Sequence, residues 1–166
     1  MTIIIKNKET LLFEDFKFKC SVGKKGFSKN KKEGDYTTPK GIFRLGNIYY
    51  RADRVQKPQS KIKAIKIKKE MGWCDDPKSK FYNKLIKIRK ESKFNYEKLF
   101  RRDYKYDLLI LIKYNYEKVI KHKGSAIFLH LTKNYKPTSG CIALIKKDFL
   151  ILLKIISRNS RIEIKN

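Results

Sequence analysis

One histidine and one cysteine near the C-terminus have the types and spacing of a thiol nucleophile with its base. In the segment HLTKNYKPTSGCIAL, His130 ends one apolar run, a Pro-Thr-Ser-Gly loop follows, and Cys141 begins the next apolar run. An imidazole close to a thiol lowers the thiol pKa, and the thiolate is the form that attacks a carbonyl. Gly140 allows a close backbone approach, so that amide N–H groups can face a substrate oxygen. The placement suits Cys141 as a thiol nucleophile with His130 as the nearby imidazole.

A purely structural interpretation of the same two residues is also open at this level. Cys141 fits a small buried hydrophobe, since free cysteine is among the most buried residue types. His130 fits a core histidine whose ring nitrogens are satisfied by its neighbours. One cysteine and one histidine eleven residues apart do not by themselves decide between catalysis and packing.

Other kinds of site find little support. The chain has only two histidines and contains no H-E-x-x-H motif and no paired C-x-x-C motif, so we expect no metal site. The stretch GKKGFSKNKKEG is rich in glycine but lacks the Gly-Lys-Ser/Thr order of a P-loop, and we expect no cofactor. Asp75 and Asp76 are adjacent, so their side chains diverge, and the D-D-P sequence is typical of a turn.

The composition is strongly basic, because 42 Lys and Arg residues against 16 Asp and Glu residues give a formal net charge of +26. This charge favours a polyanionic partner, and a basic polyanion-binding module is therefore an alternative function of another class. However, 34 of the basic residues are lysines, spread from Lys6 to Lys165. Lysine, isoleucine and asparagine have AT-rich codons, so base composition is sufficient to explain the excess. We do not expect nucleic acid as the partner.

Cysteine usage and the N-terminus bear on the compartment. Cys20, Cys74 and Cys141 cannot all pair within one chain, which fits a reducing environment. The N-terminus lacks the run of about 7 to 15 apolar residues of a signal peptide. No stretch reaches the roughly 18 apolar residues of a membrane span. We expect a cytoplasmic location, or a periplasmic one if a leader precedes this sequence.

The elements that must position His130 and Cys141 are mostly strands. Period-two alternation and short apolar runs predict strands, and polar segments rich in glycine and proline predict loops. Strands are expected at 2–6, 16–22, 42–50, 61–68, 107–114, 124–131 and 160–166, with the first two joined as a hairpin, a long loop at 23–41 and a short helix at 92–102. Apolar residues at Phe149, Leu150, Leu153 and Ile156, with Asp148 near the start, predict a C-terminal amphipathic helix.

These elements predict a mainly β fold. Seven or eight short strands with one main helix fit a β-sandwich or a partly closed barrel in which the helix covers one opening. The length of 166 residues fits one domain, and we expect a single domain over residues 1–166.

Several ordered motifs resemble one enzyme family. HLTKNYKPTSGCIAL is similar to the catalytic segment of the YkuD-type L,D-transpeptidases, whose usual pattern is a His followed later by Ser/Thr-His-Gly-Cys. EGDYTTPKGIFRL resembles the family signature E-G-D-x-x-T-P-x-G-x-F-x-L. YRADRV, GWCDDP, the Tyr-Asn of Phe81-Tyr82-Asn83 and GSAIFLH resemble extended signatures of a signal-less branch of the family. The resemblance extends from about Cys20 to Ile164.

The resemblance implies a β fold of the L,D-transpeptidase type with Cys141 as nucleophile and His130 as base. It also implies that the amides of Gly140 and Cys141 donate to the oxyanion. The sequence departs from the family pattern, since Ser139 stands at the second family histidine, Ala143 stands at an asparagine, and the His-to-Cys spacing is shorter. We expect Ser139 to supply one hydrogen bond of the missing imidazole.

Three further residues of the branch-like motifs are candidates for substrate binding. Arg51 and Arg54 can bind carboxylates bidentately, and Trp73 can pack on the stem of a peptide substrate. The alternative is that Arg51-Ala52-Asp53-Arg54 forms a structural ion-pair turn. Asp35 and Thr38 are expected to shape the long loop.

The activity implied by the resemblance is acyl transfer on murein stem peptides or muropeptides. The enzyme would cleave the bond between the L-centre of the third residue and the following D-Ala through an acyl-enzyme. An amine as acceptor gives a crosslink, which makes the chain an L,D-transpeptidase. Water as acceptor gives a cytoplasmic L,D-carboxypeptidase of muropeptide recycling. The sequence does not choose between these acceptors, and it does not indicate an oligomeric state.

Overall fold

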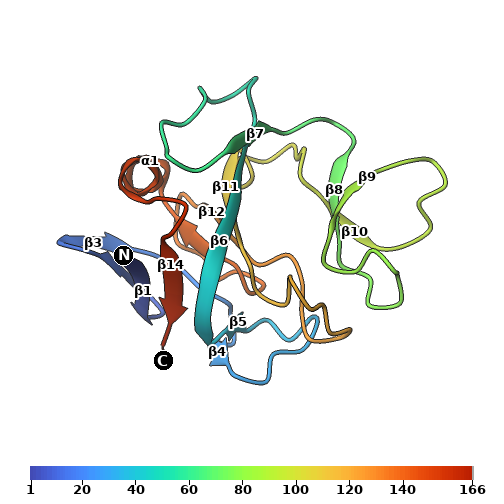
Figure 1. The fold of residues 1–166 in the computed structure, drawn as a ribbon, viewed down its shortest axis with the longest axis horizontal. Helices are drawn as coiled ribbons and strands as arrows, with labels where there is room; N and C mark the ends of the chain where they lie inside the picture. Colours follow the sequence, from blue (N-terminus) through green and yellow to red (C-terminus); the bar gives the residue numbers. More distant parts are fainter. Residues whose placement is uncertain (166) are drawn as a thin grey trace.

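A strongly curved sheet of nine strands organises the computed structural model, which describes residues 1–165 (Figure 1). The strand order is β13-β12-β11-β6-β14-β1-β2-β3, and β7 pairs with β6. The strands of this sheet are β1 (Thr2–Asn7), β2 (Thr10–Phe13), β3 (Phe16–Lys19), β6 (Gly41–Tyr50), β7 (Ala64–Lys66), β11 (Leu108–Ile112), β12 (Phe128–Leu131), β13 (Ile142–Leu144) and β14 (Arg161–Ile164).

The two ends of this sheet meet. Just after β3, the Ser21 N–H donates to the Ala143 carbonyl of β13 at 2.9 Å, and the Ala143 N–H donates to the Ser21 carbonyl at 2.9 Å. This bridge joins the last strand of the path to the first, so the sheet closes on itself as a partly closed barrel. The expected mainly β fold with one C-terminal helix is confirmed.

The central strands are buried on both faces. Along β11, Leu108, Ile110 and Ile112 pack into the larger hydrophobic cluster, whereas Leu109 and Leu111 pack into a second cluster around Trp73 and Phe128. A strand covered on both sides needs apolar residues at every position, which explains the continuous run in the sequence.

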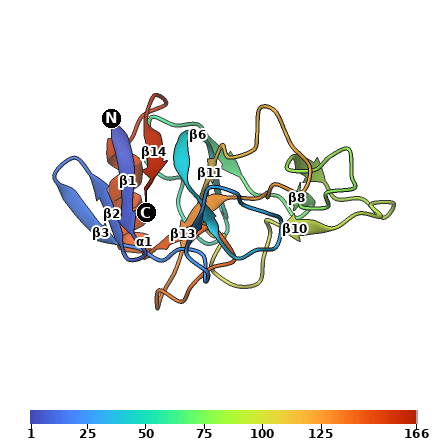
Figure 2. The same cartoon turned by 90° about the horizontal axis from the view of Figure 1, so that it is seen from below.

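A small sheet covers the second cluster. It has the order β10-β8-β9 and consists of β8 (Met71–Cys74), β9 (Leu85–Lys87) and β10 (Tyr96–Lys98). Figures 1 and 2 both show it at the opposite end of the molecule from β1 and β3. A third pair, β4 (Phe27–Ser28) with β5 (Thr38–Pro39), lies within the long loop that precedes β6.

The helix α1 (Lys146–Ile155) closes the larger cluster as expected. Phe149 and Leu153 are fully buried, Ile156 just beyond the helix is also buried, and Leu150 is partly buried. Asp148 in the first turn and Lys154 in the last turn complement the helix dipole.

Two local expectations were wrong. Residues 1–20 form three antiparallel strands rather than two, because TLLF (10–13) pairs with both neighbours as β2. Residues 92–102 contain β10 instead of a helix, since Tyr96 and Glu97 pair with Cys74 and Trp73 across the small sheet. This tertiary pairing overrides the local helical preference.

The expected last strand is confirmed as β14, which lies parallel to β1. Asn166, the end of the range expected for it, lies outside the described residues. Within residues 1–165, no helix is long and apolar enough to cross a membrane.

Truncating Phe149 tests the packing of α1 against the larger hydrophobic cluster. Phe149 is 0% exposed, so Phe149→Ala should lower the free energy of unfolding by about 3–5 kcal/mol, measured by urea denaturation. Lys154→Ala on the exposed face of the same helix should change it by less than about 0.5 kcal/mol. Equal effects of the two variants would contradict the assigned orientation of α1.

Candidate active site

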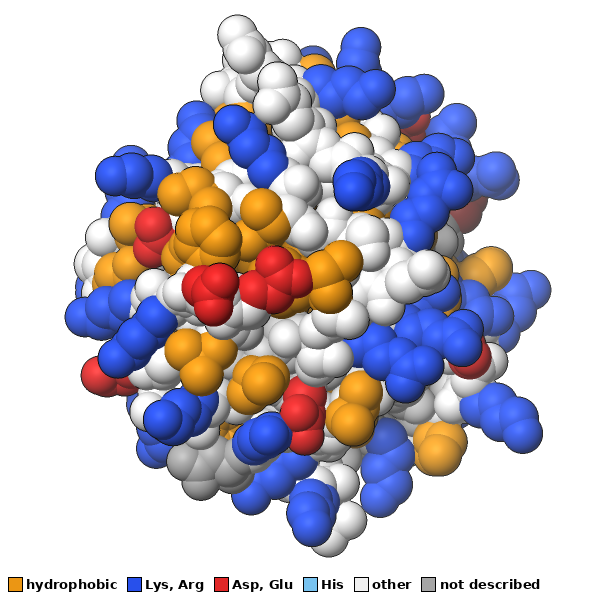
Figure 3. Space-filling model, turned by 60° about the vertical axis from the view of Figure 1, so that its left-hand side comes forward, with side chains coloured by type: hydrophobic (Ala, Val, Ile, Leu, Met, Phe, Trp, Pro, Cys, Tyr) orange, Lys and Arg blue, Asp and Glu red, His pale blue; other side chains and the backbone are white. Residues whose placement is uncertain are grey.

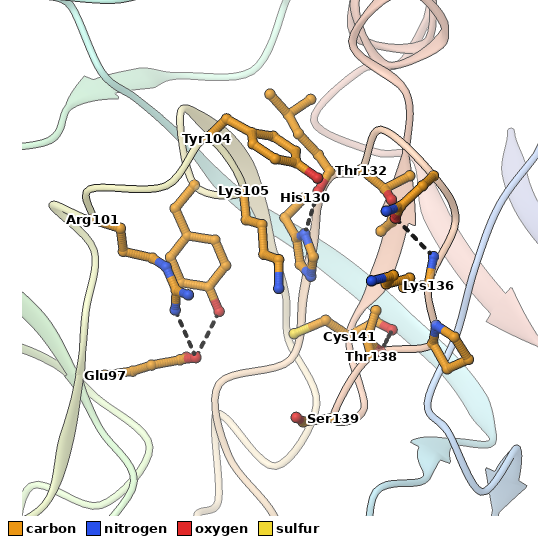
Figure 4. Close-up of a pocket in the computed structure, with 15 residues that line it drawn as sticks. Glu97, Arg101, Tyr104, Lys105, His130, Thr132, Lys136, Thr138, Ser139 and Cys141 are labelled. Carbon is orange, nitrogen blue, oxygen red and sulfur yellow. Dashed lines mark hydrogen bonds and ion pairs between the residues drawn. The ribbon is translucent and has the colours of Figure 1, made fainter.

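His130 and Cys141 are brought together by two neighbouring strands. β12 and β13 pair in parallel with His130 opposite Ala143, and Cys141 directly precedes β13. Both side chains line one cavity of about 370 Å³, and Figure 4 shows the cysteine sulfur and the imidazole on its wall. The structure therefore places the two residues that the sequence singled out at one site.

Hydrogen bonding fixes the tautomer of His130. Its Nδ1 lies 2.9 Å from the Leu131 carbonyl, which can only accept, so Nδ1 carries the proton. In the neutral ring, Nε2 then has a free lone pair. Burial lowers the pKa of His130 to about 4, against the opposing effect of the Leu131 carbonyl, and the charges of Lys105 and Arg101 lower it further. At neutral pH, His130 is therefore an uncharged base.

The resting thiol of Cys141 is protonated. Its Sγ accepts from the Phe128 N–H at 3.4 Å, and its S–H donates to the Ala126 carbonyl at 3.2 Å. Burial and the nearby Glu97 carboxylate raise the pKa of Cys141 to about 12, although the Phe128 amide favours the thiolate. The cavity therefore holds a neutral thiol and a neutral imidazole.

The loop before Cys141 is held by two threonines. Thr138 Oγ1 donates to the Cys141 carbonyl at 2.5 Å and accepts from the Gly140 N–H at 3.1 Å. Thr38 Oγ1, from β5, donates to the Gly140 carbonyl at 2.8 Å and accepts from the Gly23 N–H at 2.8 Å. These bonds tie the loop to the N-terminal segment.

Gly140 is required by space as well as by conformation. Its φ is +146°, and an added Cβ would lie 2.8 Å from the Thr37 carbonyl oxygen. Its amide is engaged by Thr138, whereas the Cys141 amide donates to no group within residues 1–165. Of the two expected oxyanion donors, the structure leaves the Cys141 amide available. The exposed Ser139 borders the cavity beside it.

A buried ion pair lies against the same loop. Lys31 is only 3% exposed, and its Nζ donates to Asp35 Oδ1 at 2.7 Å. Asp35 also accepts from the amides of Lys32 and Thr37 and from the Thr37 hydroxyl. Partial burial raises the pKa of Asp35, but these donors outweigh it and lower the pKa to about 2. The Lys31 ammonium lies 3.4 Å from where a Cβ on Gly140 would stand.

Arg51, Arg54 and Trp73 do not line the cavity that holds Cys141 and His130. Arg51 is 3% exposed and is held by both Asp53 oxygens and by the Arg101 carbonyl. Arg54 donates to the Asp103 and Arg102 carbonyls and to Asp107. Trp73 is buried, with its indole N–H on Asn83. The two arginines fasten the segment 101–107, which supplies several residues to the wall of the cavity.

Residues that the sequence analysis did not select complete the surroundings of the thiol. Glu97, Arg101, Lys105 and Tyr106 line the cavity from the segment that had been expected to be helical, and from the loop that follows it. Lys31 was indistinguishable from the many other lysines. The positions of all these residues depend on pairing between segments far apart in the sequence, and a local sequence pattern does not predict such pairing.

The described residues show neither one basic surface on the face of Figure 3 nor a metal-binding cluster. On the face shown in Figure 3, Lys and Arg side chains lie scattered around a patch of hydrophobic and acidic ones and do not form one basic surface. No group of three or more His, Cys, Asp or Glu side chains in the described part of the chain is arranged to hold a metal ion.

Comparison with known proteins identifies one family. The family model YkuD, the L,D-transpeptidase catalytic domain, matches residues 1–164. Among solved structures, the chain is similar to the helical cell shape determining protein Pgp2 from Campylobacter jejuni, with 17% identity and a TM-score of 0.49. The alignment covers 99% of this chain and 46% of that one, so the chain spans about half the length of that protein. No curated protein matches this chain.

The buried ion pair can be tested by a double-mutant cycle. Asp35→Asn leaves the Lys31 ammonium buried without its counter-charge and should lower the free energy of unfolding by about 3 kcal/mol at pH 7. The double variant with Lys31→Met removes the stranded charge and should be more stable than Asp35→Asn alone. Because the folded-state pKa of Asp35 is below its ordinary value, the wild type should lose this stabilisation as the pH falls from about 4 through about 2. Additive effects in urea denaturation would contradict the coupling.

The protonation state of Cys141 can be read from its alkylation rate. With a thiol pKa of about 12, alkylation by iodoacetamide should rise about tenfold per pH unit between pH 7 and 10 without reaching a plateau. Mass spectrometry of the peptide containing Cys141 separates it from the buried Cys20 and Cys74. A plateau in the alkylation rate that begins near pH 8 would show that the surroundings of Cys141 do not raise the pKa of its thiol.

Proposed function

Because this chain belongs to the YkuD family of L,D-transpeptidase catalytic domains, which act on the stem peptides of peptidoglycan, we propose that it is a cysteine acyltransferase of murein tetrapeptides. Its reaction is cleavage of the bond between the L-centre of the third residue and the following D-Ala. The observation that carries this proposal is the shared cavity, which both Cys141 and His130 line, with Nδ1 of His130 bonded to the Leu131 carbonyl and Nε2 left to act as the base.

The first half-reaction is acylation of Cys141. The thiol passes its proton to Nε2 of His130 as Sγ attacks the carbonyl carbon, and the Cys141 amide donates to the oxygen that becomes negative. The tetrahedral intermediate then collapses, and the bond from carbon to nitrogen breaks. The imidazolium of His130 returns the proton to the departing D-Ala amine, leaving a thioester on Cys141.

Positive charge around the cavity that holds Cys141 and His130 supports a donor that carries carboxylates. Arg101, Lys105 and Lys136 line it together with the hydroxyl of Thr132 and the amide of Asn134. A stem peptide that ends in D-Ala brings a carboxylate close to its scissile bond, and charge-assisted hydrogen bonds to such a group are the stronger ones in proteins.

The second half-reaction transfers the acyl group to an acceptor. An amine that attacks the thioester gives a crosslink, and water gives carboxypeptidase activity. In either case His130 takes the proton of the attacking group and returns it to the Cys141 sulfur as the carbon–sulfur bond breaks.

Mass spectrometry with a disaccharide tetrapeptide tests this function. The wild type should release D-Ala and show a thioester adduct, and Cys141→Ala should do neither, because it lacks the nucleophile. Cys74→Ala, which removes a buried thiol outside the cavity, serves as the matched control. If a folded wild-type sample forms neither adduct nor product, the proposed activity is wrong.

A further inference from the structure

A second cavity, of about 200 Å³, also borders Cys141, and its walls are acidic. Glu33, Asp75 and Glu97 line it, together with Lys31, whose charge is matched by Asp35. The chain has 42 basic residues against 16 acidic ones, so its net charge is strongly positive. Three carboxylates at one small cavity therefore give that cavity a charge opposite to that of the chain as a whole. The larger cavity, which also borders Cys141, is lined by three basic side chains, Arg101, Lys105 and Lys136, besides Glu97.

In the described part of the chain, the carboxylates of Glu33 and Asp75 in this cavity have no cationic hydrogen-bond partner. Glu33 Oε2 accepts from the hydroxyls of Tyr82, at 2.5 Å, and Ser125, at 2.7 Å. Asp75 Oδ1 is buried and accepts no hydrogen bond within residues 1–165. Burial and the charge of Glu33 raise the pKa of Asp75, so a cation in the cavity would relieve both effects.

Glu97 stands where the two cavities meet. It lines both of them, as Cys141 does, and its side chain is 32% exposed. Its Oε1 accepts from the Tyr106 hydroxyl at 2.9 Å and lies 3.8 Å from Arg101, which is itself paired with Asp103. Figure 4 shows Glu97 on the side of the cysteine sulfur away from Thr132 and Lys136.

Tyr106 links Glu97 to the catalytic histidine. Its ring is 4% exposed and packs edge-on against His130, with ring centroids 5.4 Å apart. The contact fixes the hydroxyl that holds the Glu97 carboxylate. Glu97 and His130 are thus held on either side of one buried ring, close to the same sulfur.

On the basis of the function proposed above, we propose that Glu97 selects an ammonium-bearing acyl acceptor and removes its first proton, which makes amine transfer the dominant fate of the acyl-enzyme. A primary amine is mostly protonated at neutral pH and cannot attack until it loses a proton. His130 handles the proton of the attack itself, so a second base is needed for the excess proton of the ammonium. A carboxylate in an acidic cavity beside the thioester both attracts the cation and accepts that proton.

The proton balance of this step is complete. The acceptor ammonium gives one proton to the Glu97 carboxylate, and the free amine attacks the thioester carbon. The second amine proton passes to His130 and then to the Cys141 sulfur as the carbon–sulfur bond breaks. Glu97 afterwards releases its proton to water. Burial raises the pKa of Glu97, against the opposing effects of Tyr106 and Arg101, which makes it a stronger base than an exposed carboxylate.

The experiment compares acceptors on the preformed acyl-enzyme. The thioester formed with disaccharide tetrapeptide is offered either Nα-acetyl-lysine, whose side chain arrives as an ammonium, or hydroxylamine, which is uncharged at neutral pH. The ratio of the two transfer rates is measured by mass spectrometry. Glu97→Gln should lower the ratio of lysine transfer to hydroxylamine transfer at least tenfold, because only the charged acceptor needs the carboxylate. Tyr106→Phe, which frees Glu97, should lower it in the same direction by less.

Glu91→Gln, an exposed residue on the connection between β9 and β10, is the matched control and should leave the ratio unchanged. An equal loss with both acceptors in Glu97→Gln would make Glu97 merely structural and overturn the inference. A wild-type thioester that passes its acyl group only to water would overturn it too, while leaving the proposed acylation intact. Absence of any thioester in the wild type would instead remove the proposed function itself.

Discussion

The geometry of the site depends on the point at which the sheet closes on itself. The Ser21–Ala143 bridge joins the two sheet ends only two residues after Cys141, and Thr38 ties the neighbouring Gly140 to Gly23. The cysteine therefore sits where strands from both ends of the chain meet, and its backbone cannot shift without breaking buried hydrogen bonds. A backbone held by several hydrogen bonds keeps the Cys141 amide in a fixed position, which a preorganised hydrogen-bond donor requires.

Burial at this junction also sets the protonation states of Cys141 and His130. Both the thiol and the imidazole are held in their neutral forms, since the protein removes them from water without giving either a fixed partner charge. In the acylation proposed above, the nucleophile therefore stays unreactive until a substrate supplies the carbonyl. In the same proposal, the two cavities that border Cys141 give the donor and the acceptor surroundings of different charge.

How far the sequence predicts these features depends on the range of the interactions. Local patterns predict two strands and the helix: the apolar runs at 107–114 and 124–131, and the helical period around Phe149. They do so because the burial of an element determines which of its positions are apolar. The spacing of His130 and Cys141 predicts that they share one site for a similar reason, since the loop between them is short, and both do line one cavity. Glu97 had no such signal, because only its pairing opposite Trp73 brings it to the thiol. Lys31 and Tyr106 line the cavities beside Cys141 without a local sequence signal, again because long-range pairing brings them there.

The place of the last strand in the sheet has a consequence for how the chain assembles. β14 lies between β6 and β1, so β1 joins this side of the sheet through a strand that is very far from it in the sequence. Until β14 pairs with β1, the antiparallel ribbon β1–β3 has an open edge on that side. Pairings between segments so far apart in the sequence form slowly, so chaperone protection of that edge is most valuable until β14 has paired.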